Sequence, residues 1–245
     1  MPPLLEGERI DYVTEGLEII QSKDVFAFSI DAVLLAKFTY VPITKGSIID
    51  LCSGNGIIPL VLSTRSSVPI TGIEIQPRLV DMARRSVQYN HLDGRLTFIE
   101  GDIREKNIIE KAGKADLVTC NPPYFATPGK KQWNNNPYFT MARHERNGTL
   151  NDMTAAAASL VKQKGKVSMV LRPERLPELM EVYRKHDLEP KRLKFVHPKA
   201  GKEANIVLLE AIKGGKPGLT CLPSLIVYNE DGKYTEEFQD YYAGN

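Results

Sequence analysis

The chain has 245 residues and a formal net charge of +2 at pH 7, which is too close to neutral to indicate a polyanion partner, so a basic surface must come from local clusters. No apolar run approaches about eighteen residues and no basic leader opens the chain, which predicts a soluble cytosolic protein without a membrane partner. The three cysteines and four histidines show neither disulfide nor metal-ligand spacing, so we expect free thiols and no metal site.

Two short segments with alternating apolar and polar residues open the chain. Residues 8–12 and 17–21 predict a β-hairpin. A helix capped by Ser29 or Asp31 is expected next, packed on the sheet over its first strand. Phe28, just before this helix, is expected to be a core residue.

A glycine-rich loop follows the first central strand, residues 47–52. Gly54 and Gly56 allow a tight turn and let a ligand approach the backbone, while the helix that follows offers free amide donors. Pro59 stands where a dinucleotide fold has its third small residue, which argues against a pyrophosphate-binding turn and a nicotinamide dehydrogenase. Asp50 is charged where a purely structural strand would be apolar. The sequence therefore predicts a nucleotide-type loop.

The next two strand segments also bring carboxylates to their ends. Residues 68–75 contain Glu74, roughly 20 residues after the glycine loop, where a carboxylate can accept hydrogen bonds from ribose hydroxyls. Residues 96–100 lead to Asp102, which can accept from an adenine amino group, and to Ile103, which can cover the adenine ring. Three carboxylates at three successive strand ends, with a glycine loop among them, indicate a nucleotide site.

The tetrapeptide Asn121-Pro122-Pro123-Tyr124 follows an apolar strand at residues 116–120. A proline pair cannot continue a strand ladder, so the chain must turn out of the sheet. The turn holds Asn121 at the carboxyl edge, leaves the Pro122 carbonyl without an obvious ladder partner and presents the Tyr124 ring beside both. Because open α/β sheets bind ligands at this edge, these four residues are candidates for the catalytic centre, although a rigid surface turn explains the same residues.

A polar stretch, residues 125–138, comes next and carries the only tryptophan of the chain, Trp133, beside two lysines. This composition suits stacking on a base with phosphate contacts beside it. A surface loop with one partly buried aromatic residue explains the same stretch equally well.

The second half of the chain is expected to complete the sheet. A helix capped by Asn151 or Asp152 precedes a fifth strand and a further helix. Two strands, residues 193–196 and 205–211, are joined by too short a connection for a parallel crossover, which predicts an antiparallel hairpin within a locally basic region. A separate small hairpin is expected around residues 231–232.

The order of these elements, with the glycine loop, the acidic strand ends and the tetrapeptide, resembles the class I S-adenosylmethionine-dependent methyltransferases over roughly residues 26–211. The resemblance implies an α/β, Rossmann-like fold with a seven-stranded, mostly parallel sheet and an antiparallel carboxyl-terminal hairpin. We expect an amino-terminal hairpin extension (1–25), a methyltransferase domain (26–212) and a tail packed on the same domain (213–245). In that family an Asn-Pro-Pro-Tyr marks methylation of a nitrogen in a planar amino or amide group.

Three further segments, 26–35, 142–145 and 171–176, resemble the bacterial valine-tRNA adenine-N6 methyltransferases, which modify the adenine beside the anticodon. This implies S-adenosylmethionine as cofactor and tRNA as partner. The implied cofactor-binding residues are Phe28, Asp31, Asp50, Cys52, Gly54, Gly56, Glu74, Ile75, Asp102, Ile103 and Asn121. The implied substrate-binding residues are Tyr124, Lys130, Lys131, Trp133, Arg143, Lys199 and Lys202. Cys52 departs modestly from the glycine that is common at that position.

Other functions remain open at this point. A protein-glutamine methyltransferase acting on a release factor or ribosomal protein would use the same tetrapeptide, although we see no separate helical amino-terminal domain of the kind those enzymes have. Methylation of adenine in DNA or ribosomal RNA is a second alternative. A nucleotide-binding module without catalysis is a third.

Overall fold

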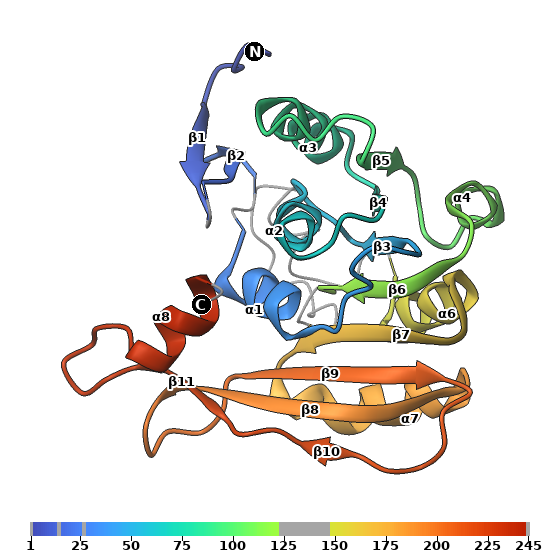
Figure 1. Cartoon of the computed structure of the whole chain (residues 1–245), viewed down its shortest axis with the longest axis vertical. Helices are drawn as coiled ribbons and strands as arrows, with labels where there is room; N and C mark the ends of the chain where they lie inside the picture. The colour runs from blue at the N-terminus through green and yellow to red at the C-terminus, as the bar shows by residue number, and fades with distance from the viewer. Residues whose placement is uncertain (1, 14–15, 26–27, 123–147, 244–245) are drawn as a thin grey trace, which may run out of the picture.

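The computed structural model describes residues 2–13, 16–25, 28–122 and 148–243. A nine-stranded sheet runs through them and carries the other elements (Figure 1). Its strands are β3 (Ile48–Leu51), β4 (Ile70–Glu74), β5 (Leu96–Glu100), β6 (Ala115–Cys120), β7 (Val161–Leu171), β8 (Leu188–Lys199), β9 (Ile206–Lys213), β10 (Thr220–Cys221) and β11 (Leu225–Tyr228). Their order is β10-β8-β9-β7-β6-β3-β4-β5, and β11 also pairs with β8.

The central seven strands, from β5 to β8, confirm the predicted fold class. The strands β5, β4, β3, β6 and β7 are parallel to their neighbours. The strand β9 runs antiparallel to both β7 and β8, so the predicted carboxyl-terminal hairpin is present.

The expected small hairpin around residues 231–232 is present as a short one: Tyr228 and Tyr234 form an antiparallel bridge, the Asn229 amide donates to the Lys233 carbonyl at 2.8 Å, and the Thr235 amide donates to the Val227 carbonyl at 3.0 Å. The sequence did not predict that its first strand, β11, also runs parallel to β8. The strand β8, with 12 residues, offers its outer edge to β11, and the pairing buries Leu225 and Val227. An uncovered edge of that length would expose unpaired backbone groups.

Helices cover both faces of the sheet (Figure 1). They are α1 (Ile30–Phe38), α2 (Ile57–Arg65), α3 (Pro77–Tyr89), α4 (Lys106–Ala112), α6 (Leu150–Leu160), α7 (Leu176–Lys185) and α8 (Glu236–Ala243), with a short 3-10 turn at Pro173–Arg175. Buried residues of α1, α2, α3 and α8 form one apolar cluster, and those of α4, α6 and α7 form another on the opposite face. None of the helices in the described parts of the chain is long and apolar enough to cross a bilayer.

Two helix details differ from the expectation. The helix α1 packs mainly against α2, β7 and β9 rather than over the first central strand. The helix α6 is capped by Thr149 instead of Asn151 or Asp152. Thr149 Oγ1 accepts from the Asp152 amide at 3.2 Å and the Asp152 carboxylate accepts from the Thr149 amide at 2.8 Å, so the two residues form a reciprocal capping box.

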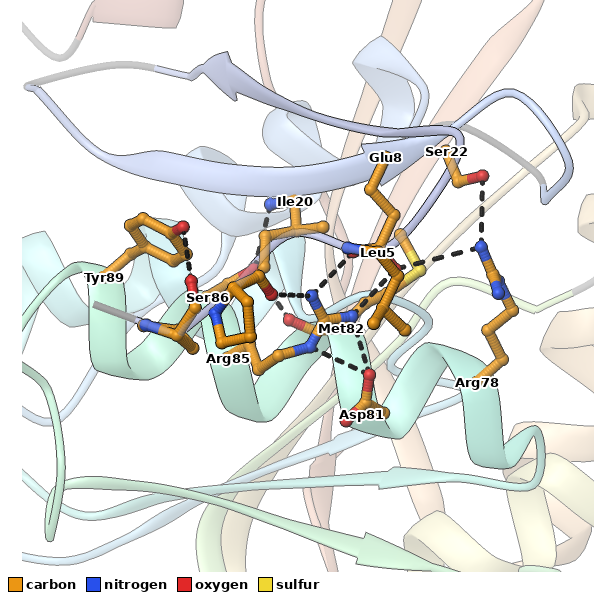
Figure 2. A network of polar contacts seen from close by, with 12 residues as sticks. Leu5, Glu8, Ile20, Ser22, Arg78, Asp81, Met82, Arg85, Ser86 and Tyr89 are labelled. Carbon is orange, nitrogen blue, oxygen red and sulfur yellow. Dashed lines mark hydrogen bonds and ion pairs between the residues drawn. The ribbon is translucent and has the colours of Figure 1, made fainter.

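The amino-terminal hairpin of β1 (Glu8–Tyr12) and β2 (Glu18–Ser22) is present as predicted and lies on α3 (Figure 2). The Arg85 guanidinium donates to both carboxylate oxygens of Glu8, at 2.6 and 2.7 Å, and also to Asp81. The Ile20 amide donates to Ser86 Oγ at 3.0 Å. Charge-assisted, bidentate contacts of this kind are among the stronger polar interactions, so the hairpin is held in one position on α3.

Replacing Arg85 by alanine is expected to loosen the hairpin, because Glu8, whose side chain has no exposed surface, would lose its two short bonds to the guanidinium and keep Arg78, at 3.8 Å, as its remaining cation. The free energy of unfolding should fall by about 1–3 kcal/mol, and the amides of β1 and β2 should exchange faster with solvent. Urea denaturation and hydrogen exchange read by mass spectrometry measure the two effects. Arg9→Ala, which removes an exposed ion pair with Asp11, is the control and should change neither. Unchanged exchange in R85A would mean that apolar packing alone holds the hairpin.

Candidate active site

The strand register brings the predicted site residues to one edge of the sheet. The strand β3 lies between β4 and β6, with Asp50 opposite Gly72 on one side and Thr119 on the other. Because these strands are parallel, the glycine loop, Glu74 and Asn121 all follow their carboxyl ends. The pairing therefore places them at one edge of the sheet.

The glycine loop has a backbone that few side chains tolerate. Gly54 and Gly56 have φ angles of 57° and 88°, in the left-handed region. A Cβ on Gly54 would meet nothing within 4 Å, so open space lies against the backbone there. A Cβ on Gly56 would lie 2.8 Å from the Phe98 ring. Cys52 also has a positive φ, 54°, a conformation that costs a residue with a side chain about 1–2 kcal/mol.

Two backbone amides fix the Glu74 carboxylate. The Gly54 amide donates to Oε2 at 2.9 Å and the Gln76 amide donates to Oε1 at 3.0 Å. Burial raises the pKa of Glu74 above its ordinary value, while these amide bonds favour the charged form. A carboxylate oxygen can accept more than one hydrogen bond, so Glu74 keeps acceptor capacity for a ligand.

Asp50 joins the glycine loop to β6. Thr119 Oγ1 donates to Oδ1 at 2.6 Å and Ser53 Oγ donates to Oδ2 at 2.7 Å. Asp50 has no exposed surface, and this burial, with a smaller contribution from the Glu74 charge, raises its pKa to about 7 even though the two hydroxyls favour the charged form. The structure therefore places Asp50 behind the loop, where it positions Ser53 and Thr119.

Asn121 follows β6 with its side-chain oxygen buried. Asn121 Oδ1 has no hydrogen-bond partner among the described residues, although an unpaired buried acceptor costs about 1–3 kcal/mol. Pro122 beside it is buried. Residues 123–147 lie outside the described residues, and with them the predicted site residues Pro123, Tyr124, Lys130, Lys131, Trp133 and Arg143.

Asp102 and Ile103 lie just beyond β5, next to the end of β4. Arg104 holds the Asp102 carboxylate through its guanidinium and, at 2.9 Å, through its backbone amide. The contact with Arg104 keeps the pKa of Asp102 below its ordinary value. Ile103 is mostly buried beside Ile108, and Ile75 is half-buried. Sequence reasoning missed Arg104, although an aspartate and arginine two residues apart gave a local signal.

The hairpin links the glycine loop to the start of α1. Asn55 Nδ2 donates to the Ile20 carbonyl at 3.1 Å, and the Phe28 amide donates to Gln21 Oε1 at 3.1 Å. Phe28, expected in the core, is only half-buried and packs against the apolar cluster from outside, and Asp31 in the first turn of α1 is buried. Asn55 and Gln21 were not among the predicted site residues, and no local pattern indicates that they would bridge the hairpin to the loop and to α1.

Lys199 and Lys202 lie at the turn after β8. The strand β8 is antiparallel to β9, which is antiparallel to β7, so the carboxyl end of β8 reaches the same edge as Asn121. Three strand spacings separate β8 from β6, or about 14 Å. The two lysines therefore lie at the correct edge but at a distance from Asn121. In the described parts of the chain, no group of histidine, cysteine or acidic residues is placed to hold a metal ion.

Comparison of the sequence with those of known proteins finds methyltransferases. Residues 17–134 match the family model described as methyltransferase small domain. A tRNA1(Val) (adenine(37)-N6)-methyltransferase of Aeromonas hydrophila is 29% identical over 212 residues, which cover 85% of each chain. Proteins of the same name from Porphyromonas gingivalis (27%, covering 78% of this chain and 75% of the relative) and Tolumonas auensis (28%, covering 93% and 92%) are also similar. The resemblance to this group, inferred above from short segments, is confirmed.

Solved structures share the fold. A predicted O-methyltransferase from Agrobacterium tumefaciens superposes with a TM-score of 0.71 at 23% identity, covering 88% of this chain and 96% of that one. A tRNA m1G37 methyltransferase of M. jannaschii gives 0.61 at 16% identity, covering 86% and 58%. The likeness establishes a Rossmann-like methyltransferase fold.

Asp50 predicts a pH dependence of stability. Its pKa is about 7 in the folded chain against an ordinary value of 3.8, so between about pH 4 and pH 7 the folded state holds a proton that the unfolded state has released. The free energy of unfolding of the wild type, relative to Asp50→Asn, should therefore fall as pH rises through this window, by up to about 1.4 kcal/mol per pH unit, and level off above it.

Denaturant titrations of both proteins from pH 5 to pH 8.5 measure this difference. Asp93→Asn, which removes the same formal charge from an exposed turn, is the matched control. A wild-type curve that runs parallel to that of D50N across the range would contradict the raised pKa.

Proposed function

We propose that this chain, which has the Rossmann-like methyltransferase fold and resembles the tRNA1(Val) adenine-N6 methyltransferases, transfers a methyl group from S-adenosylmethionine to the N6 amine of an adenine in tRNA. The expected target is the adenine beside the anticodon of a valine tRNA. The observation that carries the proposal is the buried Asn121 Oδ1, an acceptor without a partner among the described residues, at the sheet edge that holds the glycine loop. Such a substrate would place the enzyme in the cytoplasm.

The residues around the glycine loop fit S-adenosylmethionine. Glu74, held by two backbone amides, has acceptor capacity for the ribose hydroxyls. The open space at Gly54 lets the methionine part approach the backbone. Asp102 and Ile103, at the next strand end, are proposed to contact the adenine, and Arg104 shares the Asp102 carboxylate. When bound, the cofactor supplies a methyl group that its positively charged sulfur activates.

The acceptors at the turn solve the chemical problem of the substrate. An adenine amino group is a poor nucleophile because its lone pair is delocalised into the ring. If Asn121 Oδ1 and the Pro122 carbonyl each accept one of its hydrogens, the nitrogen is held toward tetrahedral geometry with its lone pair facing the methyl group. N6 would then be able to accept the methyl group that the bound cofactor would supply, and the extra N6 proton would pass to solvent, so no strong base is required.

The tetrapeptide also predicts how the base is held. Tyr124 would stack on the adenine once it leaves its neighbours, an interaction worth about 1–3 kcal/mol per base. Lys130, Lys131, Trp133 and Arg143 are proposed to contact the RNA, as are Lys199 and Lys202 from the turn after β8. These assignments rest on the sequence and on the resemblance.

Asn121→Ala should lower turnover by about 100- to 1,000-fold, the loss typical for one preorganised polar contact to the reacting group, while the dissociation constant for S-adenosylmethionine stays nearly unchanged. Glu74→Ala should instead weaken cofactor binding by about 10- to 100-fold and leave turnover at saturating cofactor nearly unchanged. Its matched control is Glu100→Ala, an exposed glutamate directly opposite Glu74 in the register of β4 and β5. Calorimetry for the cofactor and initial rates with tRNA separate the two roles.

The proposal as a whole is tested by labelled methyl transfer to RNA that lacks this modification, with nucleosides resolved by mass spectrometry. Label in N6-methyladenosine of the tRNA fraction, lost in N121A, is the expected result. Label in glutamine of a release factor, with none in RNA, would instead establish the amide substrate, since an amide nitrogen fits the same acceptors. Near-normal turnover of N121A on tRNA would overturn the mechanism.

A further inference from the structure

A cavity lies between the start of α1 and the carboxyl-terminal helix α8. Its volume is about 590 Å³, within the range of small-ligand pockets. Phe28 and Ile30 line it on one side and Tyr234, Phe238 and Tyr242 on the other. Phe28 is among the residues implied to bind the cofactor, whereas the other four have no part in the proposed transfer of the methyl group.

The aromatic side of the cavity is a fixed stack of rings. Ring centroids are 5.1 Å apart between Tyr228 and Tyr234, 4.8 Å between Tyr234 and Phe238, and 5.5 Å between Phe238 and Tyr242. Thr235 holds the stack in place, since its hydroxyl accepts from the Phe238 amide and donates to the Ile226 carbonyl of β11. Phe238 is buried and needs no ligand, but Tyr234 is 47% exposed although it stacks on two rings.

The cavity lies at the catalytic edge of the sheet. At the end of α1, Thr39 Oγ1 is 2.7 Å from Ser168 Oγ and the Tyr40 ring lies under Lys166, both in the middle of β7. The nine residues of α1 span about 13 Å, so the start of the helix lies about that far from these contacts. Figure 1 shows the start of α1, with α8 beside it, on the side to which the arrow of β6 points. Phe28 is in turn bonded to Gln21 of the hairpin.

Polar groups at the cavity suit a flat, hydrogen-bonding ligand. Gln239 lines the cavity and donates from Nε2 to the Tyr234 carbonyl at 3.0 Å, which leaves its Oε1 as an acceptor. Apolar walls with a few polar groups are typical of sites for planar heterocycles.

Charges near the cavity fit a phosphate backbone on one side only. The strand β8 brings Lys194, whose Nζ is 4.7 Å from the centre of the Tyr241 ring, and Lys199, whose Nζ donates to the Glu230 carbonyl. The helix α8 itself carries acidic residues, Glu236, Glu237 and Asp240. A polyanion would therefore run along β8 and enter the cavity with an uncharged part, such as a base.

We propose that this cavity binds a second nucleobase of the RNA substrate, the unpaired base next to the target adenine, by stacking on Tyr242, because the Tyr234 ring already stacks on Tyr228 and Phe238. The inference rests on the proposed function, because the same RNA occupies both sites. When an adenine is extruded, its neighbour loses a stacking partner, and an aromatic surface replaces that partner without reading the sequence. The cavity therefore lowers the cost of extrusion.

The test uses the full chain and a synthetic anticodon stem-loop. Tyr242→Ala should raise the KM for this RNA by about 5- to 150-fold, the range expected for loss of one base–aromatic stack. The turnover number at saturating RNA and the dissociation constant for S-adenosylmethionine should stay unchanged. Tyr242→Phe keeps the ring and should keep the wild-type KM. Tyr40→Ala, an exposed tyrosine at the other end of α1, is the matched control.

Abasic substitution identifies the base. Removing the base on one side of the target adenine should raise the KM of the wild type and add nothing to that of Y242A, because the partner is already lost. If abasic RNAs weaken wild type and Y242A by the same factor at every position, the cavity holds no base and the inference is overturned. If the wild type methylates the RNA and Y242A has the same KM as the wild type, the inference is wrong and the proposed function stands. If the wild type methylates no RNA, the proposed function is wrong, and the inference that rests on it falls with it.

Discussion

The buried carboxylate of Asp50 is the contact on which the site depends. Its two oxygens bind Ser53 in the glycine loop and Thr119 in β6. One side chain therefore holds the glycine loop next to β6, the strand that Asn121 follows. Removing a carboxylate from water is costly, and two hydroxyl donors offset only part of that cost. Gly72, opposite Asp50, makes the arrangement possible, because a Cβ there would lie 2.6 Å from Ser53 Oγ.

Much of the fold was predictable because its signals are local. Apolar runs, a glycine loop and a proline pair gave the parallel strands, and a short connection gave the antiparallel β8–β9 pair. Two features were not predicted, because their signals in the sequence are weak or come from distant residues. The helix α4 buries only Ile108, so it has no apolar stripe that a periodicity could indicate. The pairing of β11 depends on the free edge of β8, about 30 residues earlier in the chain.

The site was predictable to a similar degree and for the same reason. Glu74 and Asn121 could be placed from their strands alone, since strand direction fixes which edge they reach. The bond from Asn55 to Ile20 could not, because a side-chain amide gives no sign of its partner 35 residues away. The sequence predicted the hairpin only as an extension of the domain. In the structure the hairpin also contacts the glycine loop, through the bond between Asn55 and Ile20. The resemblance supplied the role of the tetrapeptide, which spacing does not reveal.

The strand order at the carboxyl-terminal side also constrains how the protein forms on the ribosome. The strand β9 lies between β7 and β8, yet it is made after β8. While β8 emerges it has no partner in the sheet, and it stays exposed until β9 is inserted. The strand β8 joins the sheet only when β9, which ends at residue 213, has left the exit tunnel, and β11 and α8 depend on β8 in turn. The strands β3 to β6, which carry the glycine loop, Glu74 and Asn121, can therefore fold during translation, and the aromatic cavity is completed later.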